Sequence, residues 1–375
     1  MEEFDVDIDS LLNGPEEIPS STVAIEESNS TEVEQTGDIN KLYNQLEGWN
    51  RSCRDLFVDL RTVDFTVTEE DMILSFKDKN YFDKDIYFKI DPEHPKDPKT
   101  LQALKQFCKF LGIPQPFFSQ NRPSLKMNIV KTWQTGLRAD EKKGTCIARI
   151  RESKECCILR AMVPETYSTI QNHEIINTVR ETLKVPFRLD YYEGDGRDSL
   201  ILHTRFLFGD IFKILDLDVC LGFSITASEL GASPLIVDAF LFDTLHKTTY
   251  IASYGTESFF KTKYEGLQPK DIKELLPKMV ERIQLEAPEM KQTIEDFNKA
   301  IVPLDECLLV RGWRGLPGKF KKALYQEMAE KGEDVKTHWD FALKMGLIAK
   351  DFDTPNRVAI EKAAGRYLNL VFEKS

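Results

Sequence analysis

The first 40 residues constrain the fold of this chain most, because they hold twelve acidic residues and neither a lysine nor an arginine. The 375-residue chain has 62 acidic and 50 basic residues, so the part after residue 40 is electrically balanced. A segment that is rich in Glu, Ser, Thr and Asn buries too little apolar surface to offset its conformational entropy. We therefore expect residues 1–39 to be a disordered acidic tail, with the folded part beginning near residue 40.

Two interpretations of this tail are open. Apolar and acidic residues alternate near its start, and the apolar positions of interest are Phe4, Ile8, Leu11 and Leu12. The tail is either a solvated segment that keeps the protein in solution, or a short motif that binds a protein partner or the chain's own basic surface. A coil of 40 residues spans about 35 Å, which is enough for the second role.

Hydrophobic periodicity after residue 40 predicts an α+β fold. A mostly antiparallel central sheet with flanking helices is expected over 40–255, which we treat as an α+β core domain. Residues 256–375 are predicted to form a helical C-terminal region, with helices that include 269–285 and 287–301. The apolar segments near 234–244 and 247–253 are predicted to form a hairpin.

Several protein classes are not expected. No run of about 18 apolar residues is present, so we expect no transmembrane helix and no membrane partner. The sequence starts Met1-Glu2-Glu3, which lacks the positive charge and apolar stretch of a secretory signal. The seven cysteines include no Cys-x-x-Cys pair, which is typical of a reduced intracellular protein.

Catalytic motifs are absent from the sequence. Its five histidines are widely spaced, and we expect no metal, cofactor or catalytic residue. Residues 312–320 differ from a phosphate loop because Trp313 stands where glycine is required and Phe320 replaces the Ser or Thr. The acidic loop 193–198 is interpreted as a turn. A metal-dependent hydrolase that uses this loop is the least favoured alternative.

Residues 119–161 carry ten basic residues against four acidic ones. Two strands are predicted here, 146–151 and 156–163, and a four-residue loop between them pairs Arg151 with Cys156. The expected outward face of this hairpin holds Arg149, Arg151 and Arg160. The expected core face of its second strand holds Cys157, Leu159, Ala161 and Val163.

Three guanidinium groups on one outward face form a surface that binds phosphate groups. The loop before the hairpin extends this surface with Arg138, Lys142 and Lys143. The other interpretation is a solvated sheet face on which the arginine stems cover Ile147 and Ile158. Both interpretations agree with the sequence.

A second basic segment, 311–322, has five basic residues and no acidic one. Its candidate binding residues are Arg311, Trp313, Arg314, Lys319, Lys321 and Lys322. Cations together with an aromatic ring suit single-stranded nucleic acid, because bases stack on the ring while the cations bind phosphates. The alternative is a connection between helices in which Trp313 and Phe320 point into the core.

Three groups of residues carry a family resemblance. The first is 159–167 with Ile170 and Asn172. The second is 222–231, where Gly231 is expected to adopt a positive φ in a turn. The third comprises Trp339, Ala342, Glu361, Ala364 and Gly365. Over about 150–370 the chain resembles the phage/plasmid-like protein family, a domain of unknown function.

This resemblance implies a protein of phages, plasmids or other mobile elements, whose genes often lie among replication and recombination genes. Together with the basic segments, it favours a non-enzymatic protein that binds single-stranded DNA in replication or recombination, annealing included. The acidic tail then regulates binding or recruits a partner, and the expected location is the cytoplasm of an infected or plasmid-bearing cell. The alternative is a virion or host-interaction protein that acts through the tail.

Overall fold

The computed structural model describes residues 38–69, 71–88, 98–137, 144–152, 157–168, 170–183, 187–193, 201–214, 217–254, 260–264, 266–299, 316–331, 335, 337–368 and 371–372. The expected acidic tail lies outside the described residues up to residue 37. The first helix begins at Ile39, close to the expected start of the folded part, and the side chain of Asp38 caps it by accepting a hydrogen bond from the Asn40 N–H at 2.8 Å.

The predicted α+β fold with a helical C-terminal part is confirmed. The helices are α1 (Ile39–Asn50), α2 (Pro98–Leu111), α3 (Gln115–Gln120), α4 (Pro123–Gly136), α5 (Asn172–Thr182), α6 (Pro269–Lys299), α8 (Gly318–Lys331), α9 (His338–Ala349) and α10 (Thr354–Tyr367). The strands are β1 (Cys53–Asp59), β2 (Val63–Val67), β3 (Met72–Phe76), β4 (Ile86–Tyr87), β5 (Thr145–Glu152), β6 (Cys157–Val163), β7 (Phe187–Glu193), β8 (Leu202–Ile214), β9 (Leu217–Ala227), β10 (Leu235–Asp243), β11 (Thr248–Ile251), β12 (Ser253–Tyr254), β13 (Phe260–Thr262) and β14 (Val371–Phe372).

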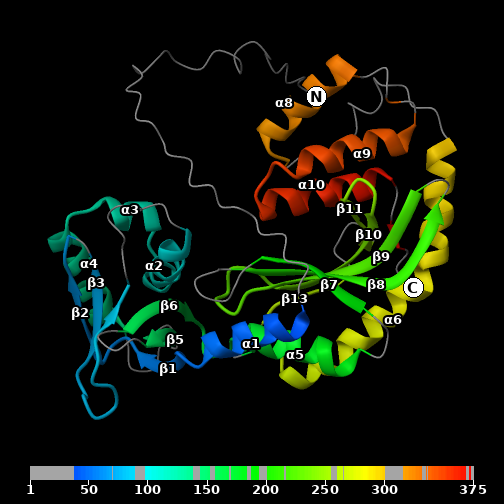
Figure 1. Ribbon diagram of the computed structural model, residues 1–375. Coiled ribbons are helices and arrows are strands. Elements are labelled where there is room, and N and C mark those ends of the chain that lie inside the picture. Colours follow the sequence, from blue (N-terminus) through cyan, green and yellow to red (C-terminus); the bar gives the residue numbers. More distant parts are fainter. Residues whose placement is uncertain are drawn as a thin grey trace, which may run out of the picture. The chain divides into compact units, whose positions relative to one another are not determined.

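The strands form two larger sheets, a division that strand periodicity alone does not specify. The first has the order β1-β5-β6-β4-β3-β2 and is antiparallel except between β4 and β6. Helices α2, α3 and α4 lie against it (Figure 1) and share its hydrophobic core, to which they contribute Phe107, Phe118 and Val130. Because all three helices pack into one core, they form a helical layer over one face of the sheet.

The second sheet has the order β11-β10-β9-β8-β7, and β13 pairs with β10. The predicted β10–β11 hairpin is confirmed, with Asp243 opposite Thr248. Residues of α5, α6, α8, α9 and α10 share one hydrophobic core with this sheet. In Figure 1, α9 and α10 run side by side next to β11. The C-terminal helices therefore pack directly on the second sheet.

Helix α6 corrects the prediction of two helices, 269–285 and 287–301. It is one helix of 31 residues that continues through Pro277 and Pro288. A proline inside a helix removes one backbone hydrogen bond. Here the buried apolar stripe continues on both sides of Pro277, with Ile272, Leu276 and Val280 at helical spacing. Packing of this stripe on the second sheet compensates for the lost hydrogen bonds.

Candidate nucleic-acid interface

The β5–β6 hairpin has a different register from the predicted one. Arg151 lies opposite Ile158 rather than Cys156. Farther along, Ile150 pairs with Leu159 but Arg149 pairs with Ala161, so Arg160 has no residue opposite it. Arg160 is therefore the extra residue of a β-bulge, and a bulge redirects the side chains around it.

The bulge also corrects the predicted core face. Cys157 and Leu159 contribute to the core of the first sheet as expected, but Met162 takes the place predicted for Ala161 and Val163. Those two residues pack on Leu230 from the second half of the chain. A one-residue insertion moves every later side chain of a strand to the opposite face, which explains the exchange.

Arg149 and Arg160 are buried, with 2% and 8% of their surfaces exposed. The Arg149 guanidinium lies 3.3 Å from the Asp55 carboxylate and donates hydrogen bonds to the backbone carbonyls of Glu229 and Ser168. The Arg160 guanidinium lies 2.7 Å from the Glu229 carboxylate. Both groups thus bind protein partners inside the fold rather than facing solvent.

The third arginine of the hairpin also has a protein partner. The guanidinium carbon of Arg151 lies 4.9 Å from the centre of the Trp49 ring, and that of Arg160 lies 5.8 Å from the same ring. Burial raises the pKa of the Asp55 carboxyl although Arg149 acts against it, and burial likewise raises the pKa of the Cys53 thiol against Arg160. The predicted outward arginine face is therefore a junction within the protein.

The turn after β9 completes this junction. The Glu229 carboxylate accepts a second hydrogen bond from the backbone N–H of Asn172, at 3.1 Å. The Tyr167 hydroxyl donates to the carbonyl of Ser228 at 3.0 Å, and Gln106 donates to the carbonyl of Leu230 at 2.7 Å. Many residues that carried the family resemblance meet here, although they are far apart in sequence.

The other predicted binding residues are distributed as follows. Arg138, Lys142 and Lys143 lie outside the described residues, as do Arg311, Trp313, Arg314 and the acidic loop from residue 194 onward. In the first turn of α8, Lys319 and Lys322 are exposed and Lys321 is half-buried, while Phe320 between them is fully buried. The lysines of α8 are therefore available to a partner.

The helical layer carries a basic surface that the sequence windows used above did not isolate. Residues 98–137 contain six basic residues and no acidic one: Lys99, Lys105, Lys109, Arg122, Lys126 and Lys131. The basic region 119–161 described above begins in the middle of this segment and includes four acidic residues that follow it. The absence of Asp and Glu from residue 98 to residue 137 was the sequence signal that would have found it.

Four of these six basic side chains are exposed, namely Lys105, Lys109, Arg122 and Lys131. On α2 the buried residues lie at 103, 104, 107, 108 and 111, so Lys105 and Lys109, four residues apart, face away from the sheet. On α4, Val130 is buried and the adjacent Lys131 points outward. None of the four forms an ion pair with a described residue.

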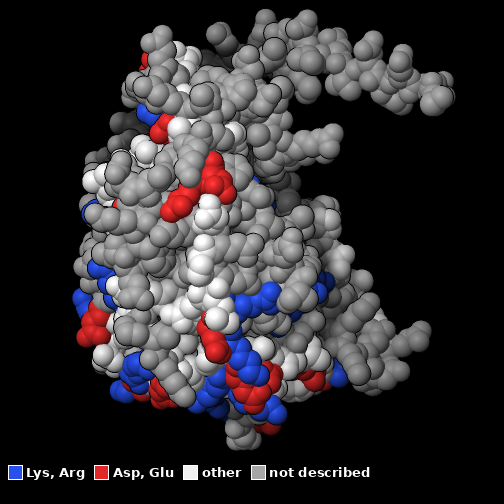
Figure 2. Space-filling model, turned by 90° about the vertical axis from the view of Figure 1, so that its right-hand side faces the viewer, with Lys and Arg blue, Asp and Glu red and all other residues white. Residues whose placement is uncertain are grey.

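Lys126 differs from these four residues. Its ammonium nitrogen lies 5.9 Å from the centre of the buried Phe118 ring, and partial burial lowers its pKa. On the face drawn in Figure 2, basic and acidic residues are interleaved among the residues it colours. The segment that forms the helical layer, in contrast, contains no acidic residue.

A second buried polar cluster lies between α10 and the second sheet. The Arg205 guanidinium lies 2.5 Å from the Glu361 carboxylate, and the Lys362 ammonium lies 2.7 Å from the Asp238 carboxylate. Burial raises the pKa of Glu361, with Arg205 acting against it. Burial lowers the pKa of His203, and Arg205 adds to this effect. The cluster fixes α10 on the sheet, and its members are buried except for Lys362, whose side chain is 25% exposed.

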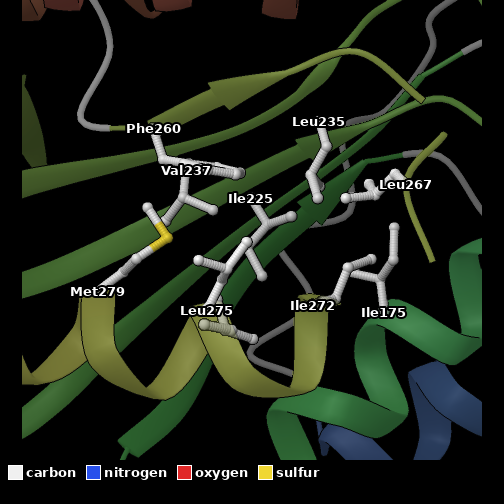
Figure 3. A pocket seen from close by; sticks show the side chains of 10 residues that line it. Ile175, Ile225, Leu235, Val237, Phe260, Leu267, Ile272, Leu275 and Met279 are labelled. Atoms are coloured by element: carbon white, nitrogen blue, oxygen red, sulfur yellow. The ribbon is translucent and has the colours of Figure 1, made fainter. Parts of the chain in front are cut away.

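Neither of two hollows lined by described residues marks a ligand site. The one shown in Figure 3 lies where Leu275 and Met279 of α6 face Val237 and Phe260, and it encloses about 10 Å³ among apolar side chains, which is room for roughly one water molecule. A surface groove of about 420 Å³ is lined in part by Arg54 and Lys84. Both of these cations lie within 4 Å of Glu152, so the groove is not a centre of net positive charge.

Among the described residues, no group of His, Cys, Asp and Glu side chains is arranged to hold a metal ion. The helices of the described ranges also include none with the length and apolar character that crossing a membrane requires. Comparison with family models, curated proteins and solved structures gives no match. The candidate interface is therefore the helical layer, on the basis of its exposed basic residues and the absence of acidic residues from its segment.

Proposed function

We propose that this chain binds single-stranded nucleic acid through the outer surface of the helical layer. One observation carries this proposal: residues 98–137 have six basic residues, no acidic one, and four exposed cations that form no ion pair with a described residue. Phosphate groups bind most strongly to cations that do not first have to leave a carboxylate. Displacement of counterions from the nucleic acid then supplies much of the binding free energy.

The lysines of α8 provide additional positive charge in this proposal, and the hairpin arginines have a structural role. The finer assignment is a non-enzymatic phage-type protein that acts on single-stranded DNA during replication or recombination, in the cytoplasm of the host cell. It rests on the sequence resemblance described above. The acidic tail, with twelve carboxylates and no base, is assigned the role of a competitor for the basic surface.

A charge-removal experiment with a matched control tests the proposal. One variant replaces Lys105, Lys109, Arg122 and Lys131 by Ala. The control variant replaces four other exposed lysines, Lys261, Lys263, Lys270 and Lys278, and so loses the same total charge. Binding of labelled oligo-dT is measured by fluorescence anisotropy at low salt.

We expect the layer variant to bind at least about tenfold more weakly and the control variant to change by no more than about twofold. Equal weakening of both variants would mean that net charge, rather than the helical layer, controls binding. An absence of oligo-dT binding by the unmodified chain, with or without residues 1–37, would refute the proposed function altogether.

A further inference from the structure

An aromatic side chain is exposed within the basic helical layer. Phe117 of α3 is 53% exposed, although a large apolar side chain gains free energy by burial. It lies in the same acid-free segment as the four exposed cations. An exposed phenyl ring among cations, with no carboxylate in the segment, is a combination that needs an explanation.

The helix that carries Phe117 is firmly held. The adjacent Phe118 is buried, and its ring meets the Phe107 ring of α2 edge-on with 6.1 Å between the centres. Pro114 and Pro116 restrict the backbone at the start of α3. After the helix, the Asn121 side-chain amide donates a hydrogen bond to the Phe117 carbonyl at 2.6 Å. The position of the Phe117 backbone is therefore fixed from both sides.

The burial of Phe118 determines where Phe117 points. Successive residues of a helix are rotated by about 100° around its axis. When Phe118 enters the core, Phe117 is directed away from it and toward the outer surface of the layer. The phenyl ring is thus presented to solvent from a rigid support, so little conformational entropy is lost when a flat group packs on it.

We propose that Phe117 stacks on an unpaired base and makes the helical layer selective for single-stranded over double-stranded nucleic acid; this inference rests on the proposed function. In a duplex the faces of the bases are covered by their neighbours, whereas in a single strand they are accessible to an aromatic ring. The phosphates of the same strand then lie near cations such as Arg122, which follows Phe117 by five residues in the sequence.

Two other partners fit the exposed ring less well. An anionic membrane binds amphipathic helices with a long apolar face, but α3 has only six residues, and Leu125 is the other large exposed apolar side chain in the described part of the layer. An apolar protein surface would favour a layer with fewer charges at its centre. The unpaired cations favour a partner with negative charge and flat, stackable groups.

The test compares three variants of the full chain: F117A, F117L and F117Y. Because Phe117 is exposed, these substitutions leave the core unchanged. F57A is the control, since Phe57 is equally exposed, at 51%, but lies on β1 outside the layer. The probes are oligo-dT, a duplex with the same number of phosphates, and vesicles of anionic lipid.

We expect F117A and F117L to weaken oligo-dT binding by at least about fivefold, with duplex binding changed by less than twofold. F117Y retains a stacking ring and should bind like the unmodified chain, as should F57A. Unchanged oligo-dT affinity of F117A, or equal weakening for both nucleic acids, overturns the inference and leaves the proposed function intact.

If F117L keeps the oligo-dT affinity of the unmodified chain, position 117 makes a general apolar contact, and the inference is overturned. It is also overturned if Phe117 is needed for binding to vesicles but not for binding to oligo-dT. If the unmodified chain binds neither nucleic acid, the proposed function and this inference fail together.

Discussion

The guanidinium of Arg160 lies 2.7 Å from the carboxylate of Glu229, 69 residues away in the chain, and both side chains are buried. Arg160 reaches this position because it is the extra residue of the β6 bulge, and Glu229 is held in the turn between β9 and β10. The pair therefore joins the first sheet to the second. It also explains why a conspicuous arginine of a basic segment is not available to a ligand.

Replacing Arg160 by Ala should lower the free energy of unfolding by about 3–5 kcal/mol. Removal of the guanidinium leaves the Glu229 carboxylate buried without its cation. The resulting loss of folding free energy is larger than the net stabilisation that the intact ion pair provides. Replacing Arg151, which is half-buried over Trp49, should cost about 1 kcal/mol or less. Urea denaturation of both variants checks this prediction, and equal, small losses would contradict the structural role of Arg160.

Replacing Gly365 of α10 by Ala should strongly destabilise the protein. A methyl group at this position would lie 1.9 Å from the backbone oxygen of Ile251 on β11, so α10 would have to move. Overpacking of this kind costs about 1–3 kcal/mol or more. Gly48 of α1 has no atom within 4 Å of an added Cβ, and its replacement by Ala should raise stability by about 0.5–1 kcal/mol. Thermal denaturation should show melting temperatures that change in opposite directions.

Stability should depend on pH through His203. Burial and the nearby Arg205 hold its pKa well below 6.5 in the folded chain, so below pH 6.5 the unfolded chain takes up a proton that the folded chain does not. The free energy of unfolding therefore decreases as the pH is lowered below about 6.5, by up to about 1.4 kcal/mol per pH unit from this residue. In His203→Gln, the difference in unfolding free energy between pH 7.5 and 5.5 should shrink by about 1 kcal/mol. An unchanged difference would show that His203 does not contribute.

Deletion of residues 1–37 should strengthen the binding of oligo-dT, because it removes eleven tethered carboxylates that compete with phosphate for the basic surface. The gain should be about threefold or more at low salt and should shrink as salt rises and screens the charges. A full-length variant with these carboxylates changed to amides serves as the control and should behave like the deletion. Anisotropy titrations measure both.

A different result would support the alternative role of the tail, which is the recruitment of a protein partner. If deletion leaves oligo-dT affinity unchanged but abolishes retention of a host protein in a pull-down, the tail is a recruiting motif. Single substitutions at Phe4, Ile8, Leu11 and Leu12 would then locate its contacts.

Local features of this chain were predictable from sequence because they depend on neighbouring residues. The short gap between two apolar segments correctly predicted the β10–β11 hairpin, and the end of the acidic segment correctly placed the start of the folded part near residue 40. Gly231 has the expected positive φ, of 73°, because the turn after β9 requires it.

Features that depend on distant partners were not predictable in this way. An even alternation of faces along β6 assumes that no bulge occurs, and the extra residue Arg160 moved the later side chains of the strand to the opposite face. The pairing of Arg151 with Ile158 differs from the predicted pairing already on the turn side of the bulge. Nothing near Arg149 or Arg160 in sequence indicates that Asp55 and Glu229 will neutralise them. The helical layer, in contrast, can be recognised in the sequence as a segment without acidic residues. That its basic side chains point outward follows only from the packing of α2 and α4 on the first sheet.

The salt dependence of oligo-dT binding tests the central claim most directly. Affinity is measured at several salt concentrations for the unmodified chain and for the variant that lacks Lys105, Lys109, Arg122 and Lys131. Each phosphate neutralised on a single strand contributes about 0.7 to the slope of log K against log salt, so four lost contacts should reduce the slope by about 3. Identical slopes for the two proteins would contradict binding through the helical layer.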